Sequence, residues 1–123
     1  MQVLIVESNQ DLGWLWKRHL ERQGCLVTLA HGQTDATAVL HETDIRVIIL
    51  DIQLEEGSAL AVADFASYRR PEAKVIFVTD TSFFSDGSIF AIAANAYAYL
   101  PTGTPPEDLA AMVEYHGAAA SPG

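Results

Sequence analysis

The chain has 123 residues, half of them hydrophobic, which is the usual size and composition of one folded domain and excludes wholesale disorder. Seven Lys and Arg against sixteen Asp and Glu give a formal net charge of −9, which argues against binding to nucleic acid or to a membrane. Cys25 is the only cysteine, so an internal disulfide is excluded, and the apolar run at residues 3–6 is too short for a signal peptide. We expect an acidic cytoplasmic domain.

Short runs rich in branched and aromatic residues predict strands. The third run, at residues 45–50, is almost continuously apolar, which is typical of strands that helices cover on both faces of a parallel sheet. The predicted strands are residues 2–7, 25–30, 45–51, 73–79 and 97–100.

The segments between and after these strands carry apolar residues at helical spacing. The last segment also begins with the signature of a capping box, in which Thr104 and Glu107 flank prolines of the first turn. The predicted apolar stripes are Leu12, Leu15, Trp16, His19 and Leu20; Ala36, Val39 and Leu40; Ala61, Phe65 and Tyr68; Ile89, Ile92, Ala93 and Ala96; and Leu109, Met112, Val113 and His116.

Strands and helices therefore alternate in a (βα)5 order. Parallel strands joined by right-handed helical crossovers form an open, doubly wound α/β sheet, for which we expect the strand order 2-1-3-4-5. We predict one domain over residues 1–117, and a flexible tail or the start of a linker over residues 118–123.

Acidic and hydroxyl side chains follow several of the predicted strands. In such a sheet, functional groups gather beyond the carboxyl ends of the strands, where this chain has Glu7, Asp51, Thr79 and Thr102. An aspartate that ends an apolar strand is costly unless it is solvated, paired or functional. Asp51 is therefore a candidate functional residue, although capping of a nearby backbone amide would also explain it.

Three segments of the sequence favour a functional role for Asp51. Residues 51–60 (DIQLEEGSAL) resemble the phospho-acceptor loop of bacterial response-regulator receiver domains, which are CheY-like and have a flavodoxin-like fold. Residues 77–80 (FVTD) resemble the end of the fourth strand in that family, and residues 99–101 with 106–109 resemble the passage from the fifth strand to the last helix. The resemblance covers about residues 2–116.

The resemblance implies a module of phosphorelay signalling rather than an enzyme. Asp51 would accept a phosphoryl group from a sensor histidine kinase or a histidine phosphotransfer protein. A Mg²⁺ ion, which prefers oxygen ligands, would be held by Glu7, Asp51 and the backbone of Gln53.

The resemblance also assigns roles to residues beyond the acceptor. Thr79 and Thr102 would contact the phosphoryl group, while Thr79 and Tyr99 would act as the switch that reports its arrival.

The chain departs from the family pattern at two places. Ser8 replaces the second acid that normally follows the first strand, which weakens the expected metal site, and Thr102 replaces the lysine that normally follows the fifth strand. Loss of that charged hydrogen bond removes about 1.5–3 kcal/mol, or roughly tenfold to hundredfold in transfer rate. The alternative to a slow phospho-acceptor is therefore a pseudo-receiver that acts through protein contacts without phosphate.

Several aromatic side chains are candidates for an interaction face. The family dimerises and signals through its fourth helix, fifth strand and fifth helix, which suggests a homodimer through Phe83, Phe84, Tyr97 and Tyr99. Phe83 and Phe84 could instead fold back over the Asp51 pocket. Trp14, off the stripe of the first helix, is either an anchor for a kinase or a half-buried ring lying over a neighbour.

Other classes fit the sequence less well. A flavodoxin needs a glycine- and hydroxyl-rich phosphate loop after the first strand, and residues 7–11 (ESNQD) are acidic and lack glycine. A dinucleotide-binding enzyme would need a glycine-rich turn at the same place. A haloacid-dehalogenase-like phosphatase would carry a second aspartate where this chain has Gln53.

Overall fold

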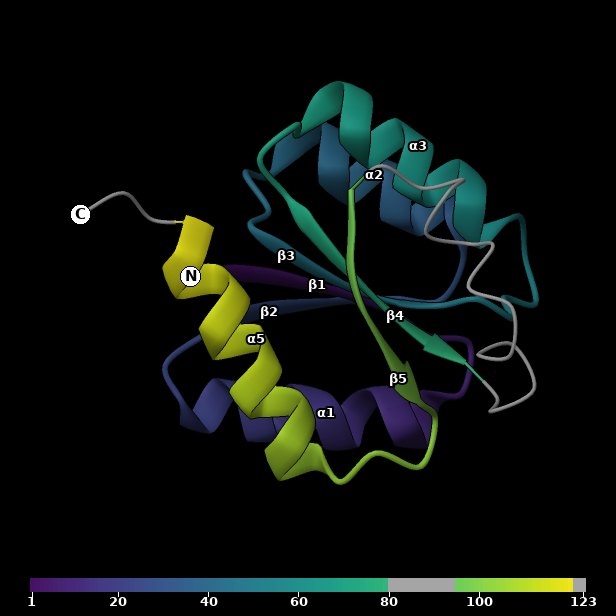
Figure 1. Cartoon of the computed structure of the whole chain (residues 1–123). Helices are drawn as coiled ribbons and strands as arrows, with labels where there is room; N and C mark the ends of the chain where they lie inside the picture. The colour runs from purple at the N-terminus through teal and green to yellow at the C-terminus, as the bar shows by residue number, and fades with distance from the viewer. Residues whose placement is uncertain (80–94, 121–123) are drawn as a thin grey trace.

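The fold is seen in a computed structural model of the chain, which describes residues 1–79 and 95–120, with side chains as far as residue 116 (Figure 1). The strands are β1 (Gln2–Val6), β2 (Leu26–Ala30), β3 (Val47–Asp51), β4 (Lys74–Thr79) and β5 (Ala96–Pro101). The helices of the described part are α1 (Gln10–Arg22), α2 (Gln33–Glu42), α3 (Ala59–Arg69) and α5 (Pro106–Ala120).

The five strands form one parallel sheet in the order β2-β1-β3-β4-β5, which confirms the predicted architecture. Leu50 of β3 pairs with Val6 of β1 and with Phe77 of β4, so these three strands end at nearly the same level. The predicted stripe of Ile89, Ile92 and Ala93 lies outside the described residues. Ala96 was expected to continue that helix, and this is wrong, because it is the first residue of β5.

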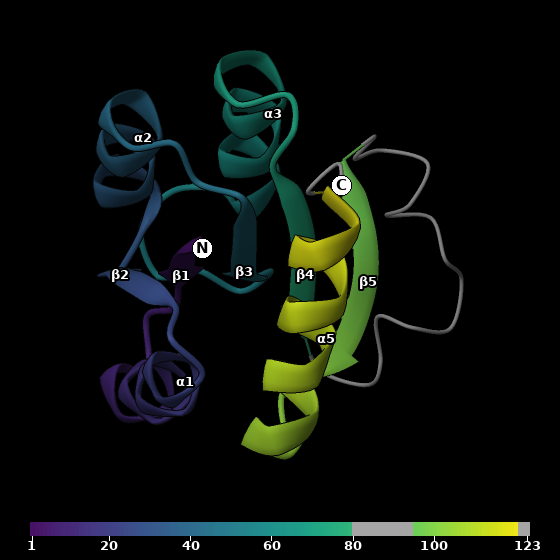
Figure 2. The same ribbon diagram turned by 90° about the vertical axis from the view of Figure 1, so that its left-hand side faces the viewer.

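Helices cover both faces of the sheet. Figures 1 and 2 show α2 and α3 on one face and α1 and α5 on the other. Alternate side chains of each strand therefore enter different cores: Leu4 and Ile48 pack toward α2 and α3, whereas Ile5 and Ile49 pack toward α1 and α5. All four are fully buried, and each such burial stabilises the fold by roughly 1.5–3 kcal/mol. The continuous apolar strands follow from this double coverage.

The buried face of α1 differs from the predicted stripe. Trp16 and Leu20 are buried as expected, but Leu15 is exposed and Gly13 takes the buried position. A Cβ at Gly13 would lie 2.7 Å from Leu29 Cδ1, so a larger residue there would require the Leu29 side chain to shift.

The stripe predicted for α3 is wrong. Tyr68 is exposed, and Ala61 and Phe65 are only partly buried. Four smaller side chains form the buried face instead, because helices α2 and α3 pack side by side over the same core and leave little room between them. These residues are Ala59, Val62, Ala63 and Ala66.

The last helix begins at Pro106, as the proline signal predicted, but the capping box does not form as expected. The hydroxyl of Thr104 donates to the carbonyl of Pro101 at 2.7 Å and so closes the turn before the helix. The predicted stripe is confirmed, since Leu109, Val113 and His116 are buried and Met112 packs against the same core. The helix continues to Ala120, into the segment expected to be a tail.

The loop before α3 supplies hydrogen-bond acceptors to the N-terminal end of α2. Gly32 caps that helix without a side chain, and Glu56 from the distant loop supplies the missing acceptors. The Glu56 backbone carbonyl accepts from Gln33 N at 3.0 Å, and its carboxylate accepts from Thr34 N at 2.9 Å. An anionic acceptor is favourable there because free N–H groups give the start of a helix a partial positive charge.

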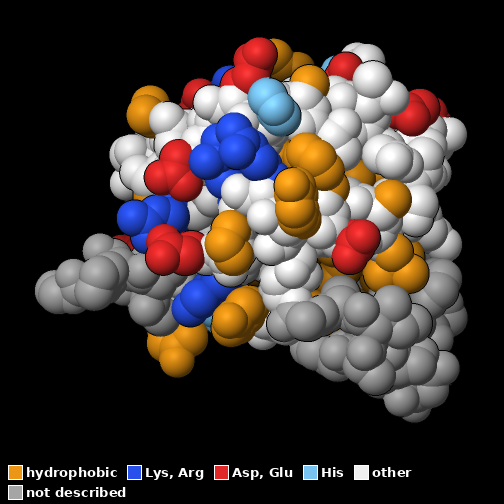
Figure 3. Space-filling model, turned by 90° about the horizontal axis from the view of Figure 1, so that it is seen from above, with side chains coloured by type: hydrophobic (Ala, Val, Ile, Leu, Met, Phe, Trp, Pro, Cys, Tyr) orange, Lys and Arg blue, Asp and Glu red, His pale blue; other side chains and the backbone are white. Residues whose placement is uncertain are grey.

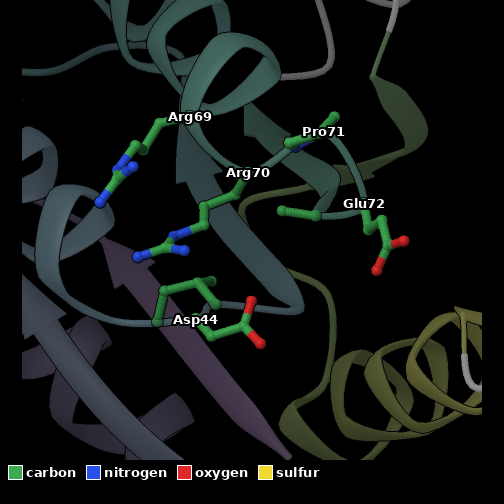
Figure 4. A pocket seen from close by; sticks show the side chains of 7 residues that line it. Asp44, Arg69, Arg70, Pro71 and Glu72 are labelled. Carbon is green, nitrogen blue, oxygen red and sulfur yellow. The ribbon is translucent and has the colours of Figure 1, made fainter.

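Arginines at the end of α3 supply hydrogen-bond donors to the C-terminal end of α2. The Arg69 guanidinium donates to the carbonyl of His41 at 2.8 Å and 3.1 Å, and Arg70 Nε donates to the carbonyl of Leu40 at 2.9 Å. Figure 4 shows both arginines extending from α3 toward these groups. They lie in a pocket of about 150 Å³ that is lined by Asp44, Ile45, Arg69, Arg70, Pro71, Glu72 and Ala73.

Residues 56–70 therefore hold α2 at both ends through cationic and anionic side chains. Seen from outside α2 and α3, the surface carries interspersed charges of both signs and scattered apolar side chains (Figure 3). Such interspersed charges contribute little individually, so the contacts at the helix ends matter more for the position of α2.

We predict that Gly57→Ala destabilises the fold. Gly57 has φ +80°, which costs an alanine about 1–2 kcal/mol, and a Cβ there would also overlap the side chain of Gln33. Denaturant unfolding should therefore show a loss of at least about 1 kcal/mol. Gly103→Ala is the matched control, because a Cβ at that position meets no atom within 4 Å. Equal stability of the two variants would contradict this account of the loop.

Candidate phosphoryl-acceptor site

The carboxyl edge of the sheet brings the predicted site residues to one end of the molecule. Glu7 directly follows β1 and Asp51 ends β3, so the register of these strands places the two residues side by side. Thr79 ends β4 one residue beyond Val78, the partner of Asp51. Thr102 follows β5, and its N–H donates to the carbonyl of Thr79 at 2.9 Å.

The Glu7 carboxyl group is the most perturbed group of this edge. Its side chain is 1% exposed, and Asn9 N donates to its Oε2 at 3.1 Å. Within the described part of the chain, Oε1 is buried without a hydrogen-bond partner. Burial, reinforced by the neighbouring Asp51 carboxyl group, raises the pKa of Glu7 to about 8. Glu7 therefore holds a proton at neutral pH.

Asp51 is half-buried and faces both the loop and Glu7. Its Oδ1 accepts from Gln53 N at 2.9 Å, so the simpler expectation that this aspartate caps a backbone amide is confirmed. The same contact brings the backbone of Gln53 to the acceptor. Ile52 N donates to the carbonyl of Val78 at 3.0 Å, which fixes the first step of the loop against β4.

Ser8 is committed to backbone groups. Its hydroxyl donates to the carbonyl of His31 at 2.9 Å and accepts from Glu55 N at 3.0 Å. One side chain thus links the loops after β1, β2 and β3. This role was not predicted, because 47 residues separate Ser8 from Glu55 and no local pattern signals such a contact.

The hydroxyl of Thr79 is the second unsatisfied group at this edge. Thr79 is 1% exposed, and its Oγ1 finds no hydrogen-bond partner among residues 1–79 and 95–120. An unpaired buried hydroxyl costs roughly 1–3 kcal/mol. A ligand that offers an oxygen to it would recover part of that cost.

Neither of the two lysines lies at this edge. Lys17 on α1 pairs with Glu21 at 3.0 Å, and Lys74 begins β4 at the opposite end of the sheet. The departure from the family pattern at Thr102 is therefore not compensated by a lysine from elsewhere.

Tyr99 lies on β5, where it pairs with Phe77 of β4. Its ring stacks on Phe77 at a centroid distance of 5.1 Å and an angle of 13°, and burial raises its pKa to about 12. The phenol therefore stays protonated at physiological pH.

The other aromatic candidates do not join the site. Tyr97 is 51% exposed and contacts Lys74 and His116, at the end of the sheet away from Asp51. Trp14 on α1 is 53% exposed, and the Lys17 ammonium lies 4.8 Å from its ring centre, so the ring is about half covered and lies against a neighbour, as in the simpler expectation. Phe83 and Phe84 lie outside the described residues.

The donors for a cation are limited. Over the described residues, no group of three His, Cys, Asp or Glu is placed to hold a metal ion. Glu7 and Asp51 remain, with the backbone of Gln53 held beside Asp51 by its N–H, and Glu7 Oε1 is a buried oxygen without a partner among the described residues. Mg²⁺ often takes only one or two carboxylates from a protein, so these residues fit a weakly held ion.

A parallel sheet of this order, with an aspartate ending its central strand beside a second acid, defines a receiver-type signalling domain. Residues 3–114 match the model of the response regulator receiver domain, and the chain belongs to that family, a component of two-component signalling. Domains of this family are signalling modules rather than enzymes in general. None of the helices in the described part is long and apolar enough to cross a membrane.

Known proteins similar to this chain share the same fold. The DNA-binding transcriptional regulator NtrC of Proteus hauseri is 23% identical over 112 residues, which are 91% of this chain but only 24% of NtrC. A CheY-like receiver domain protein from Methanospirillum hungatei superposes with a TM-score of 0.87 at 24% identity, over 97% of this chain and 94% of its own.

Another solved relative carries a modified acceptor. A response regulator protein from Burkholderia pseudomallei, solved with a phosphorylated aspartic acid, a calcium ion and citrate, superposes with a TM-score of 0.76 at 21% identity, over 98% of this chain and 75% of its own.

We predict that Glu7→Gln removes a pH dependence of stability. Because the folded-state pKa is raised from 4.5 to about 8, the folded protein binds more protons than the unfolded chain between these values, and stability falls as pH rises through them. In metal-free buffer, the parent should lose stability relative to the variant as the pH rises. The free energy of unfolding of the variant minus that of the parent should increase by at least about 1 kcal/mol from pH 5 to pH 8.

Glu42→Gln removes an equal charge from the exposed end of α2 and is the control. If Glu7→Gln and Glu42→Gln have the same pH profile, Glu7 does not hold a proton in the folded protein.

Proposed function

We propose that this chain is the receiver module of a cytoplasmic phosphorelay and that Asp51 is its phospho-acceptor. The observation that carries the proposal is the grouping of the half-exposed Asp51 carboxyl group with the buried carboxyl group of Glu7 at the carboxyl edge, close to the unsatisfied hydroxyl of Thr79. A sensor histidine kinase or a histidine phosphotransfer protein would supply the phosphoryl group.

The proposed step is an in-line transfer. An oxygen of the Asp51 carboxylate attacks the phosphorus of a phosphohistidine, the new O–P bond forms as the P–N bond breaks, and the imidazole leaves with its electron pair and takes a proton from water. The product adds negative charge beside Glu7, which already carries a pKa raised to about 8. The rate of transfer therefore depends on how well the negative charge of the phosphoryl group is neutralised.

Mg²⁺ would supply part of that neutralisation. Glu7, Asp51 and the backbone carbonyl of Gln53 would hold it, as the donor set allows. Ser8 does not contribute, because its hydroxyl already binds His31 and Glu55. The ion would therefore be held weakly.

Thr79 and Thr102 would contact the phosphoryl group. The Thr79 hydroxyl is buried and available to donate to a phosphoryl oxygen, and Thr102 is joined to Thr79 through the backbone. Because threonine is uncharged, transfer would be roughly tenfold to hundredfold slower than with a lysine at position 102.

The signal would reach the surface through Thr79 and Tyr99. A shift of the Thr79 hydroxyl toward the phosphoryl group would change the space beside the Phe77–Tyr99 stack. The output would be a change at the face that carries Phe83, Phe84, Tyr97 and Tyr99, through which two copies would associate. The exposed ring of Trp14 would serve the phosphodonor protein on α1.

A pseudo-receiver is the second candidate. It is favoured by the hydrogen bonds of Ser8, which join the loops after β1, β2 and β3 without any ion. In that case the chain would act as a phosphate-independent interaction module, and Asp51 would only fix its loop through Gln53.

Phosphorylation with a small donor separates the two candidates. Incubation with acetyl phosphate and Mg²⁺ should add the mass of one phosphoryl group to the protein, and Asp51→Asn should abolish the addition. Asp64→Asn, on the exposed side of α3, is the control and should be labelled like the parent. Absence of labelling in the parent at high Mg²⁺ would favour the pseudo-receiver.

A second prediction concerns Thr102. Thr102→Lys supplies the missing cation and should raise the rate of labelling roughly tenfold or more, since a charged hydrogen bond contributes about 1.5–3 kcal/mol. Ala111→Lys adds the same charge to the exposed side of α5 and controls for a general electrostatic effect. An equal gain in both variants would contradict a phosphoryl contact at position 102.

A further inference from the structure

We propose that Ser8 is a positioning residue of the acceptor site, whose hydroxyl fixes the loop after Asp51 in the place of a metal-binding carboxylate. The proposal concerns how the site is held together and extends the proposed function, on which its activity readout rests. Ser8 lies at the family position of a metal ligand, yet both hydrogen-bonding directions of its hydroxyl are used within the protein.

The contacts of Ser8 are directional. Its O–H donates to the His31 carbonyl at 2.9 Å, and its oxygen accepts from Glu55 N at 3.0 Å. A carboxylate could accept from Glu55 N but could not donate to the His31 carbonyl. Serine or threonine is therefore suited to this link, and an ionised aspartate is not.

The link completes a set of bonds along the acceptor loop. Ile52 N donates to the Val78 carbonyl at 3.0 Å, Gln53 N donates to Asp51 Oδ1 at 2.9 Å, and Glu55 N donates to Ser8. These three contacts fix residues 51–55 without an ion. The last of them joins this loop to the loop after β1, next to Glu7.

The loop continues into the contacts that hold α2. Glu56 binds the first N–H groups of α2, and Ser58 N donates to Gln33 Oε1 at 2.9 Å. Ser8 therefore holds the middle of the loop at Glu55, while α2 holds its end. Loss of the Ser8 hydroxyl should loosen residues 53–55 while leaving the α2 contacts in place.

The test compares three variants by amide hydrogen exchange and by labelling with acetyl phosphate. Ser8→Ala removes the hydroxyl, Ser8→Thr retains it, and Ser58→Ala removes a different hydroxyl from the same loop, one that caps α3 by accepting from Ala61 N. Exchange of the Glu55 amide is measured in a chelator, so that no divalent cation contributes. Thermal unfolding of each variant reports its general stability.

Ser8→Ala should speed exchange of the Glu55 amide roughly three- to tenfold and slow labelling of Asp51 by a similar factor, as expected for one lost hydrogen bond. Ser8→Thr should restore both, and Ser58→Ala should change neither, even where it lowers the melting temperature. Rescue by threonine distinguishes positioning from a general loss of stability.

Unchanged exchange at Glu55 in Ser8→Ala would overturn the proposal, and so would protection of that amide in the parent that depends on added Mg²⁺. Faster exchange with undiminished labelling would also overturn the positioning role. If the parent and every variant remain unlabelled, the acceptor function of Asp51 fails instead, while exchange in chelator still decides whether the Ser8 hydroxyl holds the loop.

Discussion

The carboxyl groups of Glu7 and Asp51 lie side by side at the carboxyl edge of the sheet, and the chemistry of the site depends on this proximity. Because β1 and β3 are in register up to Val6 and Leu50, the next residues, Glu7 and Asp51, lie side by side, Glu7 buried and Asp51 half-buried. Burial of Glu7, reinforced by the neighbouring Asp51, raises the pKa of the Glu7 carboxyl group. A proton or a cation lowers the repulsion between the two groups.

Several contacts of the surrounding loops do not involve the Glu7 and Asp51 carboxyl groups. Ser8 joins three loops through uncharged hydrogen bonds, and Glu56 with Arg69 holds the two ends of α2. Charged groups at helix ends act over short distances and are only weakly coupled to a site several residues away. The contacts that hold α2 are therefore separate from the carboxyl groups at the edge of the sheet.

The sequence predicts the parts of this arrangement that depend on local pattern. Continuous apolar strands give the layers, and strand-end acids give Glu7 and Asp51. The pattern fails where close packing decides which residues are buried. On α1 Gly13 is buried while Leu15 is exposed, and on α3 small residues form the buried face while Tyr68 is exposed. The pattern also fails for Ser8, whose partners are fixed only by the tertiary fold. Spacing along one helix carries no information about how near its neighbour lies.

A proton and a metal ion compete for the same carboxyl group at this edge. Metal ligands must be deprotonated, so Mg²⁺ would have to displace the proton that burial and Asp51 keep on Glu7. Ser8 adds no charge that would favour the ion, and Thr102 adds none that would favour a phosphoryl group. For the proposed acceptor Asp51, two of the charges that typically assist transfer in the family are therefore missing. The missing charges favour slow phosphoryl transfer over rapid switching. The loop is ordered by hydrogen bonds, but only solvent and a weakly held ion would neutralise the charge of the transferred group.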